Sequence, residues 1–374
     1  MRILHIVTLV SPDGEYGGPV RVAENLSGEL VRRGHEVTVV AGRAANLGET
    51  GQFGTSRLIL FRPLLSLYKR SHVLTMSLSA MWWAWRRRGR FDVVHVHLAR
   101  DLFTGPVAWL AAGRSSRVVV QSHGMLMPRT GLVYRIFDSF TIKPVIAQAD
   151  TVLYLTDRER GELESQVPSH VPLQRLENGV PLTEGGSART YGADSETLKF
   201  LFLSRLHERK RPLDFVRAAA EVSRSGATDA SFALVGPDGG SASEVTAAIA
   251  AEGLGDSTIR WEGPIEPGLV QQRLASADVF VLPSVAEPFP MAVLEAMSAG
   301  LPVIITNECG LAGLVTEFDA GIVIEPGSES LTQAMTSLIG DPDRLAKLSV
   351  NALAAARSLS VEEIGGQLSE IYTR

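Results

Sequence analysis

Cysteine is nearly absent from this sequence. The chain of 374 residues contains one, Cys309, which cannot form a disulfide within the chain. A small disulfide-stabilised fold is therefore excluded, and a reducing compartment is favoured. Apolar runs are also short, and none reaches the roughly 20 residues that a membrane-spanning helix needs. Residues 3–10 lead into a glycine-containing loop without a cleavage pattern, which indicates a first strand and not a targeting peptide. We expect a cytoplasmic protein whose membrane contact, if any, is peripheral.

A dinucleotide-binding fingerprint is missing too. Residues 3–10 and 36–40 are typical of parallel strands, and the residues between them have helical periodicity. The order G-x-G-x-x-G is absent, however, and no acidic residue ends the second strand to hold a ribose. The adjacent Gly17 and Gly18 instead let the backbone approach a ligand closely, or form a plain tight turn.

The sequence does have the composition of a soluble globular protein, with 45% apolar residues, 21% charged residues and 35 glycines. Its length suits two domains of about 150 to 200 residues each. Strands alternate with helices in both halves, which predicts an α/β fold of two doubly wound, Rossmann-like domains. We place these domains at residues 1–182 and 198–356, because residues 183–197 have the polar, glycine-rich and aperiodic character of a linker.

The first half of the chain is the basic one. Residues 1–185 contain 22 lysines and arginines against 16 acidic residues, whereas the remainder contains 14 against 25. One stretch combines aromatic and basic side chains, namely Trp82, Trp83, Trp85, Arg86, Arg87 and Arg88. It suits contact with a lipid phosphate or a membrane surface, but a helix with buried rings and an exposed basic end has the same composition. We expect no nucleic-acid partner.

Two carboxylates and a helix start lie close together in residues 287–300. The preceding apolar run, residues 279–282, is typical of a buried strand, and Pro290 suits the first turn of a helix that Gly300 ends. A further apolar run then resumes as a strand. The loop therefore lies at the carboxyl end of a parallel sheet, where open α/β sheets bind ligands, which makes Glu287 and Glu295 candidate site residues.

Two histidines also end predicted strands. His97 ends the run of residues 92–97, and His123 ends the run of residues 117–123. A histidine in such a place is often a structural group with satisfied hydrogen bonds, which is our interpretation of His97. His123 is followed by Gly124 at the strand terminus, so we expect it to be exposed at the ligand-binding edge and to be functional.

Several motifs occur in an order that resembles one family. An arginine and a lysine lie in residues 204–210, seven residues separate Glu287 from Glu295, and Asn178-Gly179-Val180 precedes the linker. Further matches are Gly17-Gly18, Gly34-His35, His123-Gly124, Leu234-Val235-Gly236 and the strand before Ser284. Together they resemble the family 4 glycosyltransferases, which are retaining enzymes of the GT-B fold. The resemblance implies two Rossmann-like domains that face a central cleft, and a final segment, residues 357–374, that returns to the first domain.

The resemblance also implies roles for individual residues. Arg205 and Lys210 would bind the diphosphate of a nucleotide-sugar donor, a UDP- or GDP-sugar. This donor is a substrate, and we expect no cofactor. Glu295 would bind the ribose and Glu287 the transferred sugar near its 3-hydroxyl, while His123 would face the sugar from the other domain. The residues expected to act in catalysis are His123, Arg205, Lys210 and Glu287. The donor would also contact Gly17, Gly18, Phe289, Pro290, Met291, Ala292 and Glu295.

The chemistry favours these residue types independently. A leaving nucleoside diphosphate gains negative charge, which an arginine, a lysine and a helix N-terminus stabilise. Asp341-Pro342-Asp343 spells D-x-D, a manganese motif of another glycosyltransferase class, but Asp341 before Pro342 is typical of a helix N-cap. We therefore predict no metal.

The acceptor stays open among a polysaccharide precursor, a glycolipid, including a lipid-linked one, and a natural product. Paired glutamates also occur in glycoside hydrolases, but a basic pair beside a second Rossmann-like domain is not needed there. A nucleotide-sugar epimerase of similar fold and a catalytically silent sugar-nucleotide-binding module are the alternatives. Pro290 replaces a glycine that many relatives have and removes one amide donor from the loop.

Overall fold

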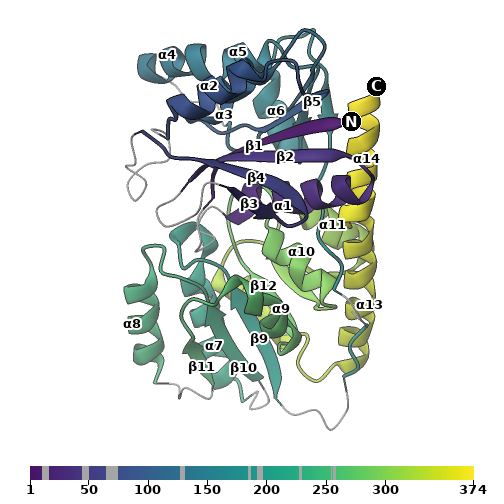
Figure 1. The fold of residues 1–374 in the computed structure, drawn as a ribbon. Coiled ribbons are helices and arrows are strands. Elements are labelled where there is room, and N and C mark those ends of the chain that lie inside the picture. The colour runs from purple at the N-terminus through teal and green to yellow at the C-terminus, as the bar shows by residue number, and fades with distance from the viewer. Residues whose placement is uncertain are drawn as a thin grey trace. The chain divides into compact units, whose positions relative to one another are not determined.

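The computed structural model of the protein describes residues 1–10, 17–43, 50–64, 75–126, 131–183, 187–191, 197–226, 230–253, 255 and 258–374. The chain forms two compact units, one made of Met1–Gly179 with Val361–Arg374 and the other of Val180–Ser360 (Figure 1). Each contains a largely parallel sheet with helices on its faces, which confirms the predicted α/β class with two doubly wound domains. No helix in the described part of the chain is both long and apolar enough to cross a bilayer.

The first unit is built on an eight-stranded sheet in the order β3-β4-β2-β1-β5-β6-β7-β8. Its strands are β1 (Arg2–Val10), β2 (Glu36–Arg43), β3 (Thr50–Phe53), β4 (Ser56–Phe61), β5 (Val93–His97), β6 (Arg117–Gln121), β7 (Thr151–Tyr154) and β8 (Leu173–Arg175). Only the hairpin β3–β4 is antiparallel among the described pairs. Every residue of β5 is buried, as expected for a parallel strand covered on both faces.

Helices cover both faces of this sheet. They are α1 (Gly17–Arg32), α2 (Leu78–Arg86), α3 (Thr104–Ala111), α4 (Leu132–Thr141), α5 (Lys143–Ile146), α6 (Asp157–Glu164) and α14 (Val361–Thr373). The last helix, α14, lies against α1, so the chain end belongs to the first unit (Figure 1). The two helices approach closely at Gly365, where a Cβ atom would lie 2.4 Å from Cγ of Glu29. Arg33 strengthens the contact by donating to the carbonyl of Glu362 at 2.6 Å.

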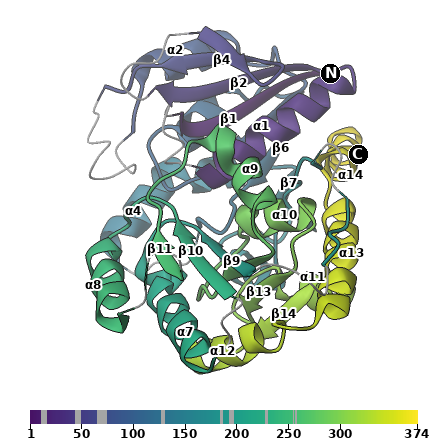
Figure 2. The same cartoon turned by 90° about the horizontal axis from the view of Figure 1, so that it is seen from below.

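The second unit contains a six-stranded parallel sheet in the order β11-β10-β9-β12-β13-β14. Its strands are β9 (Leu198–Leu203), β10 (Ala230–Val235), β11 (Ile259–Trp261), β12 (Val279–Leu282), β13 (Val303–Thr306) and β14 (Gly321–Ile324). Its helices are η2 (Glu208–Lys210), α7 (Pro212–Arg224), α8 (Ala242–Glu252), η3 (Pro267–Leu269), α9 (Val270–Ala275), α10 (Met291–Ser298), α11 (Ala312–Phe318), α12 (Ser328–Thr336) and α13 (Pro342–Ser358). Helix α7 lies between α8 and α12 on one face, and α13 packs against α10 and α11 on the other (Figure 2).

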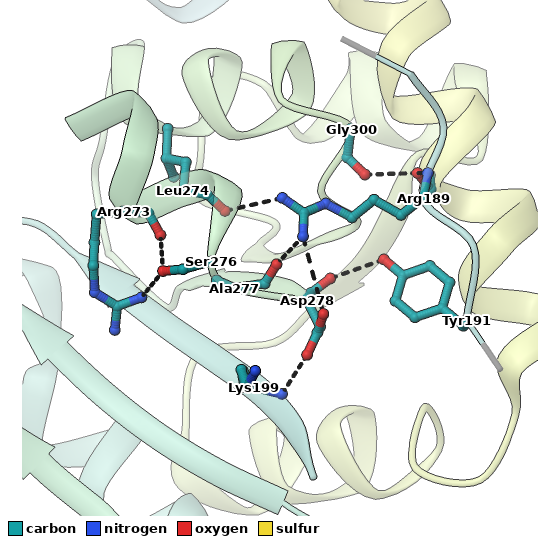
Figure 3. Close-up of polar contacts among 10 residues, drawn as sticks. Arg189, Tyr191, Lys199, Arg273, Leu274, Ser276, Ala277, Asp278 and Gly300 are labelled. Atoms are coloured by element: carbon teal, nitrogen blue, oxygen red, sulfur yellow. Dashed lines mark hydrogen bonds and ion pairs between the residues drawn. The ribbon is translucent and has the colours of Figure 1, made fainter. Parts of the chain in front are cut away.

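Residues 187–191 of the predicted linker are attached to the second unit (Figure 3). The backbone N–H of Arg189 donates to the hydroxyl of Ser349 at 2.8 Å, and its guanidinium donates to the carbonyls of Leu274, at 3.0 Å, and Ala277. The hydroxyl of Tyr191 donates to the carbonyl of Asp278 at 3.0 Å. The guanidinium thus adds a donor to the carbonyl of Leu274, which already accepts the N–H of Ala277 at 3.1 Å, and to the carbonyl of Ala277 just after α9.

Replacement of Arg189 by methionine should lower the free energy of unfolding of the second unit by about 2 kcal/mol. A net hydrogen bond to a charged group contributes roughly 1.5–3 kcal/mol, and the carbonyls of Leu274 and Ala277 would lose the guanidinium donor, although that of Leu274 keeps the N–H of Ala277. Urea unfolding followed by circular dichroism measures the change. Arg217→Met is the matched control, because Arg217 is 62% exposed on α7 and its loss should change stability by less than about 0.5 kcal/mol. Equal effects of the two substitutions would contradict a structural role for Arg189.

Candidate active site

Glu287 lies in the loop between β12 and α10, and backbone contacts hold this loop in place. The carbonyl of Glu287 accepts the N–H of Gly310 at 2.8 Å, and the residue forms an isolated bridge with Cys309. Ala286 has a φ of +48°, a left-handed conformation that side chains rarely adopt, and its N–H donates to Glu308 at 3.0 Å. A backbone fixed in this strained form directs the Glu287 carboxylate to one position.

The Glu287 carboxylate forms an ion pair with Lys210. Its Oε2 lies 2.5 Å from Nζ of Lys210 and 3.6 Å from the guanidinium of Arg209. The side chains of Glu287 and Lys210 are only 10% and 16% exposed, whereas that of Arg209 is 47% exposed. The structure therefore brings together two of the predicted residues. It adds Arg209, which belongs to the same basic motif but was not among the predicted site residues.

Lys210 ends the short helix η2, which follows β9. The imidazole of His207 caps this helix by accepting the N–H of Arg209 at 3.1 Å. Arg205 precedes it, is exposed, and lies against the loop after β10. That loop approaches because it contains glycines: a Cβ on Gly236 would lie 2.0 Å from the carbonyl oxygen of Ser204, and one on Gly239 would lie 2.7 Å from Cγ of Arg205. The glycines thus position the predicted diphosphate-binding motif.

Helix α10 begins one residue later than predicted. Pro290 is its N-cap and not a residue of its first turn, and its carbonyl accepts the N–H of Val293 at 3.1 Å. The prediction that Pro290 lies in the first turn is therefore wrong. The proline ring takes no donor from that turn, whose first amides belong to Met291 and Ala292 and have no acceptor within an α-helix.

Glu295 lies on the same face of α10 as Ala292, three residues further along the helix. It is 7% exposed, and Phe289 and Met291 on either side of the N-cap are also buried. The carboxylate of Glu295 and the amides at the start of α10 are therefore neighbours on one short helix. The start of α10 determines where the predicted donor-binding residues of this loop lie. Their contacts with a donor stay a prediction.

Cys309 lies beside Glu287 without being a candidate nucleophile. Its thiol is buried, and burial, together with the charge of Glu287, raises its pKa to about 12. A thiol with such a pKa is protonated at neutral pH, whereas the thiolate is the reactive form.

His123 lies in the turn after β6 in the first unit and has a φ of +50°. A carboxylate organises this turn: Glu159 accepts the hydroxyl of Ser122 at 2.5 Å and the N–H of Gly124 at 2.6 Å, both through Oε1. Its other oxygen accepts the N–H of Leu155 at 2.7 Å. Glu159 is 4% exposed. No sequence pattern distinguishes Glu159, because most residues of α6 are charged.

The imidazole of His123 ends a chain of hydrogen-bonded side chains. Its Nε2 lies 2.8 Å from Nδ1 of His97, whose Nε2 lies 3.1 Å from Nδ1 of His5. The hydroxyl of Tyr372, on α14, lies 3.3 Å from Nε2 of His5 and 2.5 Å from Nδ1 of His95. His97 is thus a buried and hydrogen-bonded residue, but it is also the direct partner of His123.

The four histidines of this hydrogen-bonded group, His5, His95, His97 and His123, are neutral at pH 7. Burial lowers the pKa of His5 and of His123 to about 3, and the Asn178 side chain opposes part of this shift at His123. Burial, with smaller contributions from neighbouring histidines, lowers the pKa of His95 and His97 well below the ordinary value. A neutral imidazole has one N–H donor and one acceptor nitrogen, so the tautomer of each histidine determines that of the next.

One group of described side chains lies close enough together to bind a metal. The candidate ligand nitrogens of His5, His95 and His97 are all within 4.8 Å of one another. The rings of His95 and His97 are stacked, however, with an angle of 8° between their planes. Ring lone pairs lie in the ring plane, so one ion cannot lie in both planes, and the hydrogen-bonded chain is the better description of this cluster. The D-x-D segment is an N-cap as predicted, since Asp341 accepts the N–H of Arg344 at 3.0 Å.

Gly17 and Gly18 form the start of α1. A Cβ atom on Gly18 would meet nothing within 4 Å, so neighbouring described atoms do not require a glycine there. Residues 11–16, which complete the predicted glycine loop, lie outside the described residues. The proposed contact of both glycines with a ligand stays a prediction.

Each of the two units matches a known family of glycosyltransferase domains. The family described as "Glycosyl transferase 4-like domain" matches residues 17–179, and the family described as "Glycosyl transferases group 1" matches residues 187–354. The chain is 27% identical to a D-inositol 3-phosphate glycosyltransferase of Rhodococcus opacus over 76% of this chain and 67% of that protein. It is 26% identical to the protein of the same name from Corynebacterium urealyticum, over 94% of this chain and 84% of that one.

Solved structures share the whole fold. Sucrose-phosphate synthase from Thermosynechococcus elongatus superposes with a TM-score of 0.78 at 20% identity, over 100% of this chain and 98% of that one. HepE from Anabaena, solved in complex with UDP and glucose, superposes with a TM-score of 0.75 at 19% identity, over 100% and 99%. Because two glycosyltransferase families match in tandem and the fold agrees over the full length, the chain belongs to the family 4 glycosyltransferases of the GT-B fold.

Proposed function

We propose that the protein transfers a sugar from a nucleotide-diphosphate sugar, with UDP or GDP as the leaving group, to a hydroxyl acceptor, and that the α configuration of the sugar is retained without a metal ion. The observation that supports this most directly is the Lys210–Glu287 ion pair beside Arg205, Arg209 and the start of α10. One edge of the second sheet therefore carries cations, the first-turn amides of α10 and a second carboxylate, that of Glu295.

This arrangement suits a leaving nucleoside diphosphate. As the bond to the sugar breaks, the phosphate gains negative charge, and fixed positive charges and amide dipoles stabilise it. Glu287 holds Nζ of Lys210 in place at 2.5 Å before the donor binds, so little reorganisation is needed during the reaction. We assign neither glutamate as a nucleophile: Glu287 orients the cation and the sugar, Glu295 binds the ribose, and the leaving phosphate assists deprotonation of an acceptor that attacks from the same face.

His123 contributes a neutral imidazole. Its Nε2 belongs to the hydrogen-bonded chain with His97, and its Nδ1 is buried without a hydrogen-bond partner among the described residues, so Nδ1 is the nitrogen that we assign to a sugar hydroxyl. If Tyr372 donates to His95 across the short 2.5 Å contact, its oxygen accepts the N–H of His5. His97 then donates to His5 and His123 to His97, which makes Nδ1 of His123 an acceptor.

The names of the relatives support a proposal for the substrates. The Anabaena protein was solved with UDP-glucose, and the bacterial relatives are named D-inositol 3-phosphate glycosyltransferases. We infer a UDP-type donor and a small or lipid-linked hydroxyl acceptor, used in the cytoplasm. An epimerase would interconvert nucleotide sugars without releasing nucleotide, and a silent module would bind them without turnover.

The deciding experiment incubates the protein with a panel of UDP- and GDP-sugars, with and without inositol phosphate and glycolipid acceptors, and measures the nucleotide released. Slow release that an acceptor accelerates would support the transferase. Epimerisation without release would favour the epimerase, and binding without release under every condition would favour the silent module.

The ribose assignment has its own test. Glu295→Ala should weaken the binding of the nucleotide diphosphate by about tenfold, because hydrogen bonds to a charged acceptor contribute roughly 1.5–3 kcal/mol. Calorimetric titration with UDP measures the affinity. Glu329→Ala, a change at a first-turn glutamate of α12, removes the same charge elsewhere in the unit and should have no effect. Unaltered affinity in the Glu295 variant would make the ribose assignment wrong.

A further inference from the structure

The aromatic and basic stretch around α2 forms a pocket that the proposed reaction does not use. A cavity of about 190 Å³ lies in the first unit between α2 and the sheet. The pocket opens to solvent past exposed arginines, so it is a hollow of the surface and not a void of the core. Four arginines contribute to its wall, Arg2, Arg57, Arg87 and Arg90, together with Trp83 and Glu36.

Most of this positive charge has no partner. Arg2 forms an ion pair with Asp92 at 2.9 Å. No carboxylate in the part of the chain that the structure describes forms an ion pair with Arg57, Arg87 or Arg90. Burial lowers the pKa of Arg87, and the charges of Arg90, Arg57 and Arg86 lower it further, which shows that like charges repel here. Proteins normally separate such charges, so an anion at the centre of the pocket would relieve a cost that the free protein bears.

The pocket is also pre-organised. Trp83 is buried, and the guanidinium of Arg87 lies over its ring, 4.6 Å from the ring centroid. The ring packs against Phe61 and Phe91, which fixes its position. A stacked guanidinium has lost much of its rotamer freedom already, so an anion that binds it loses less entropy in ordering it.

The position of the pocket separates it from the candidate active site. Arg2 and Glu36 are the first residues of β1 and β2, Arg57 is the second residue of β4, and Arg90 precedes β5. These are the amino ends of parallel strands, whereas His97 and His123 lie at the carboxyl ends of β5 and β6. The two sets of residues therefore occupy opposite edges of one sheet.

We propose that this arginine pocket, defined by Arg2, Arg57, Arg87 and Arg90, binds a phosphate-type anion. The planar guanidinium matches phosphate through two parallel N–H···O bonds, which makes clustered arginines the typical phosphate ligands of proteins. The pocket is open through exposed arginines, so a phosphate group attached to a larger molecule fits as well as a free one. The site does not depend on the proposed function.

Neighbouring side chains favour a lipid headgroup as the source of the phosphate. Trp82 and Trp85 on the same helix are 58% and 60% exposed, and Arg86 lies over the ring of Trp82 at 4.9 Å. Amphipathic indole rings with adjacent arginines are typical of side chains at the boundary between lipid and water. Trp83 is thus a buried ring, as one interpretation of the sequence predicted, whereas Trp82 and Trp85 are exposed, and their contact with lipid stays a prediction.

The test measures binding by the full chain. Inorganic pyrophosphate is titrated calorimetrically, and vesicles of phosphatidylglycerol with phosphatidylcholine are sedimented with the protein and compared with phosphatidylcholine alone. The double variant Arg87→Gln/Arg90→Gln is compared with Arg158→Gln, which removes an exposed arginine on α6. Every titration is repeated in Lys210→Ala protein, so that binding at the second unit does not contribute.

We expect the double variant to bind at least one probe about tenfold or more weakly, and Arg158→Gln to bind as the wild type does. Loss of vesicle binding that also follows Trp82→Ser/Trp85→Ser identifies the lipid headgroup, and loss of pyrophosphate binding alone identifies a soluble phosphate; either supports the pocket. Equal binding of both probes by the double variant and the wild type overturns the proposal, and so does a loss in the double variant that Arg158→Gln reproduces.

Discussion

Lys210→Met should lower turnover by roughly 10²- to 10³-fold while the second unit stays folded. Removal of one preorganised donor from a developing anion typically costs about 2.7–4 kcal/mol of transition-state stabilisation. Lys210 is the best-placed cation for this role, since it is 16% exposed and its Nζ is fixed by Glu287 at 2.5 Å. Arg209 lies further away, at 3.6 Å from Glu287, and is more exposed, so we expect it to compensate only in part.

The loss of Lys210 also leaves Glu287 buried without its nearest cation, and a structural effect must be separated from a catalytic one. Lys210→Met/Glu287→Gln removes both charges and restores the balance. If the lysine acts on the phosphate, the double variant stays slow although its stability recovers. Single-turnover rates with a UDP-sugar and urea unfolding of both variants provide the comparison. Recovery of turnover in the double variant would show that Lys210 only balances Glu287.

Much of the second unit could be predicted because its strands have simple patterns. Residues 279–282 and 321–324 are apolar runs between turn signals, and the structure forms β12 and β14 over these residues. The first unit was harder. The hairpin β3–β4 is short and polar at its edge, and α3 is apolar on all sides, including the exposed Trp109, so neither has a clear period.

For the candidate site, too, the sequence predicted some residues but not the contacts between them. The basic motif and the two glutamates were recognised from their spacing, but the contact between Lys210 and Glu287 depends on β9 and β12 being neighbours, which no local pattern reveals. The histidine chain was recognised only at its end. His5 and Tyr372 are 367 residues apart, and they meet because β1 pairs with β5 and α14 returns to the first unit. The alternation of His95 and His97 along β5, which points both rings to one face, was the available signal.

The buried histidines make a second strong prediction: the first unit should lose stability steeply as the pH falls below about 6.5. The pKa values of His5 and His123 are lowered to about 3 in the folded protein, and those of His95 and His97 are lowered well below the ordinary value. In the unfolded chain each would have a pKa of about 6.5. The unfolded state therefore binds more protons below this pH, so the stabilisation is complete above it and declines as the pH falls towards the folded values.

The size of the effect follows from the number of groups. Each histidine contributes up to about 1.36 kcal/mol per pH unit, so four contribute up to about 5 kcal/mol per unit between pH 6.5 and 5. Ordinary carboxylates titrate below this range and add little. Since domains are typically stable by about 5–15 kcal/mol, we expect the first unit to unfold near pH 5 at room temperature. Four of the five tryptophans, Trp82, Trp83, Trp85 and Trp109, belong to this unit and Trp261 belongs to the second, so tryptophan fluorescence of Trp261→Phe protein follows the first unit.

Urea unfolding at several pH values gives the slope, and calorimetry in buffers of different ionisation enthalpy counts the protons taken up on unfolding independently. His97→Phe should reduce the slope by about one proton, because it removes one buried imidazole and keeps a planar ring. His170→Gln replaces an exposed histidine that does not belong to the hydrogen-bonded group, and it should leave the slope unchanged. If wild-type unfolding at pH 5.5 takes up less than about one proton, the imidazoles are not held neutral by burial, and the tautomer chain that ends at His123 loses its physical basis.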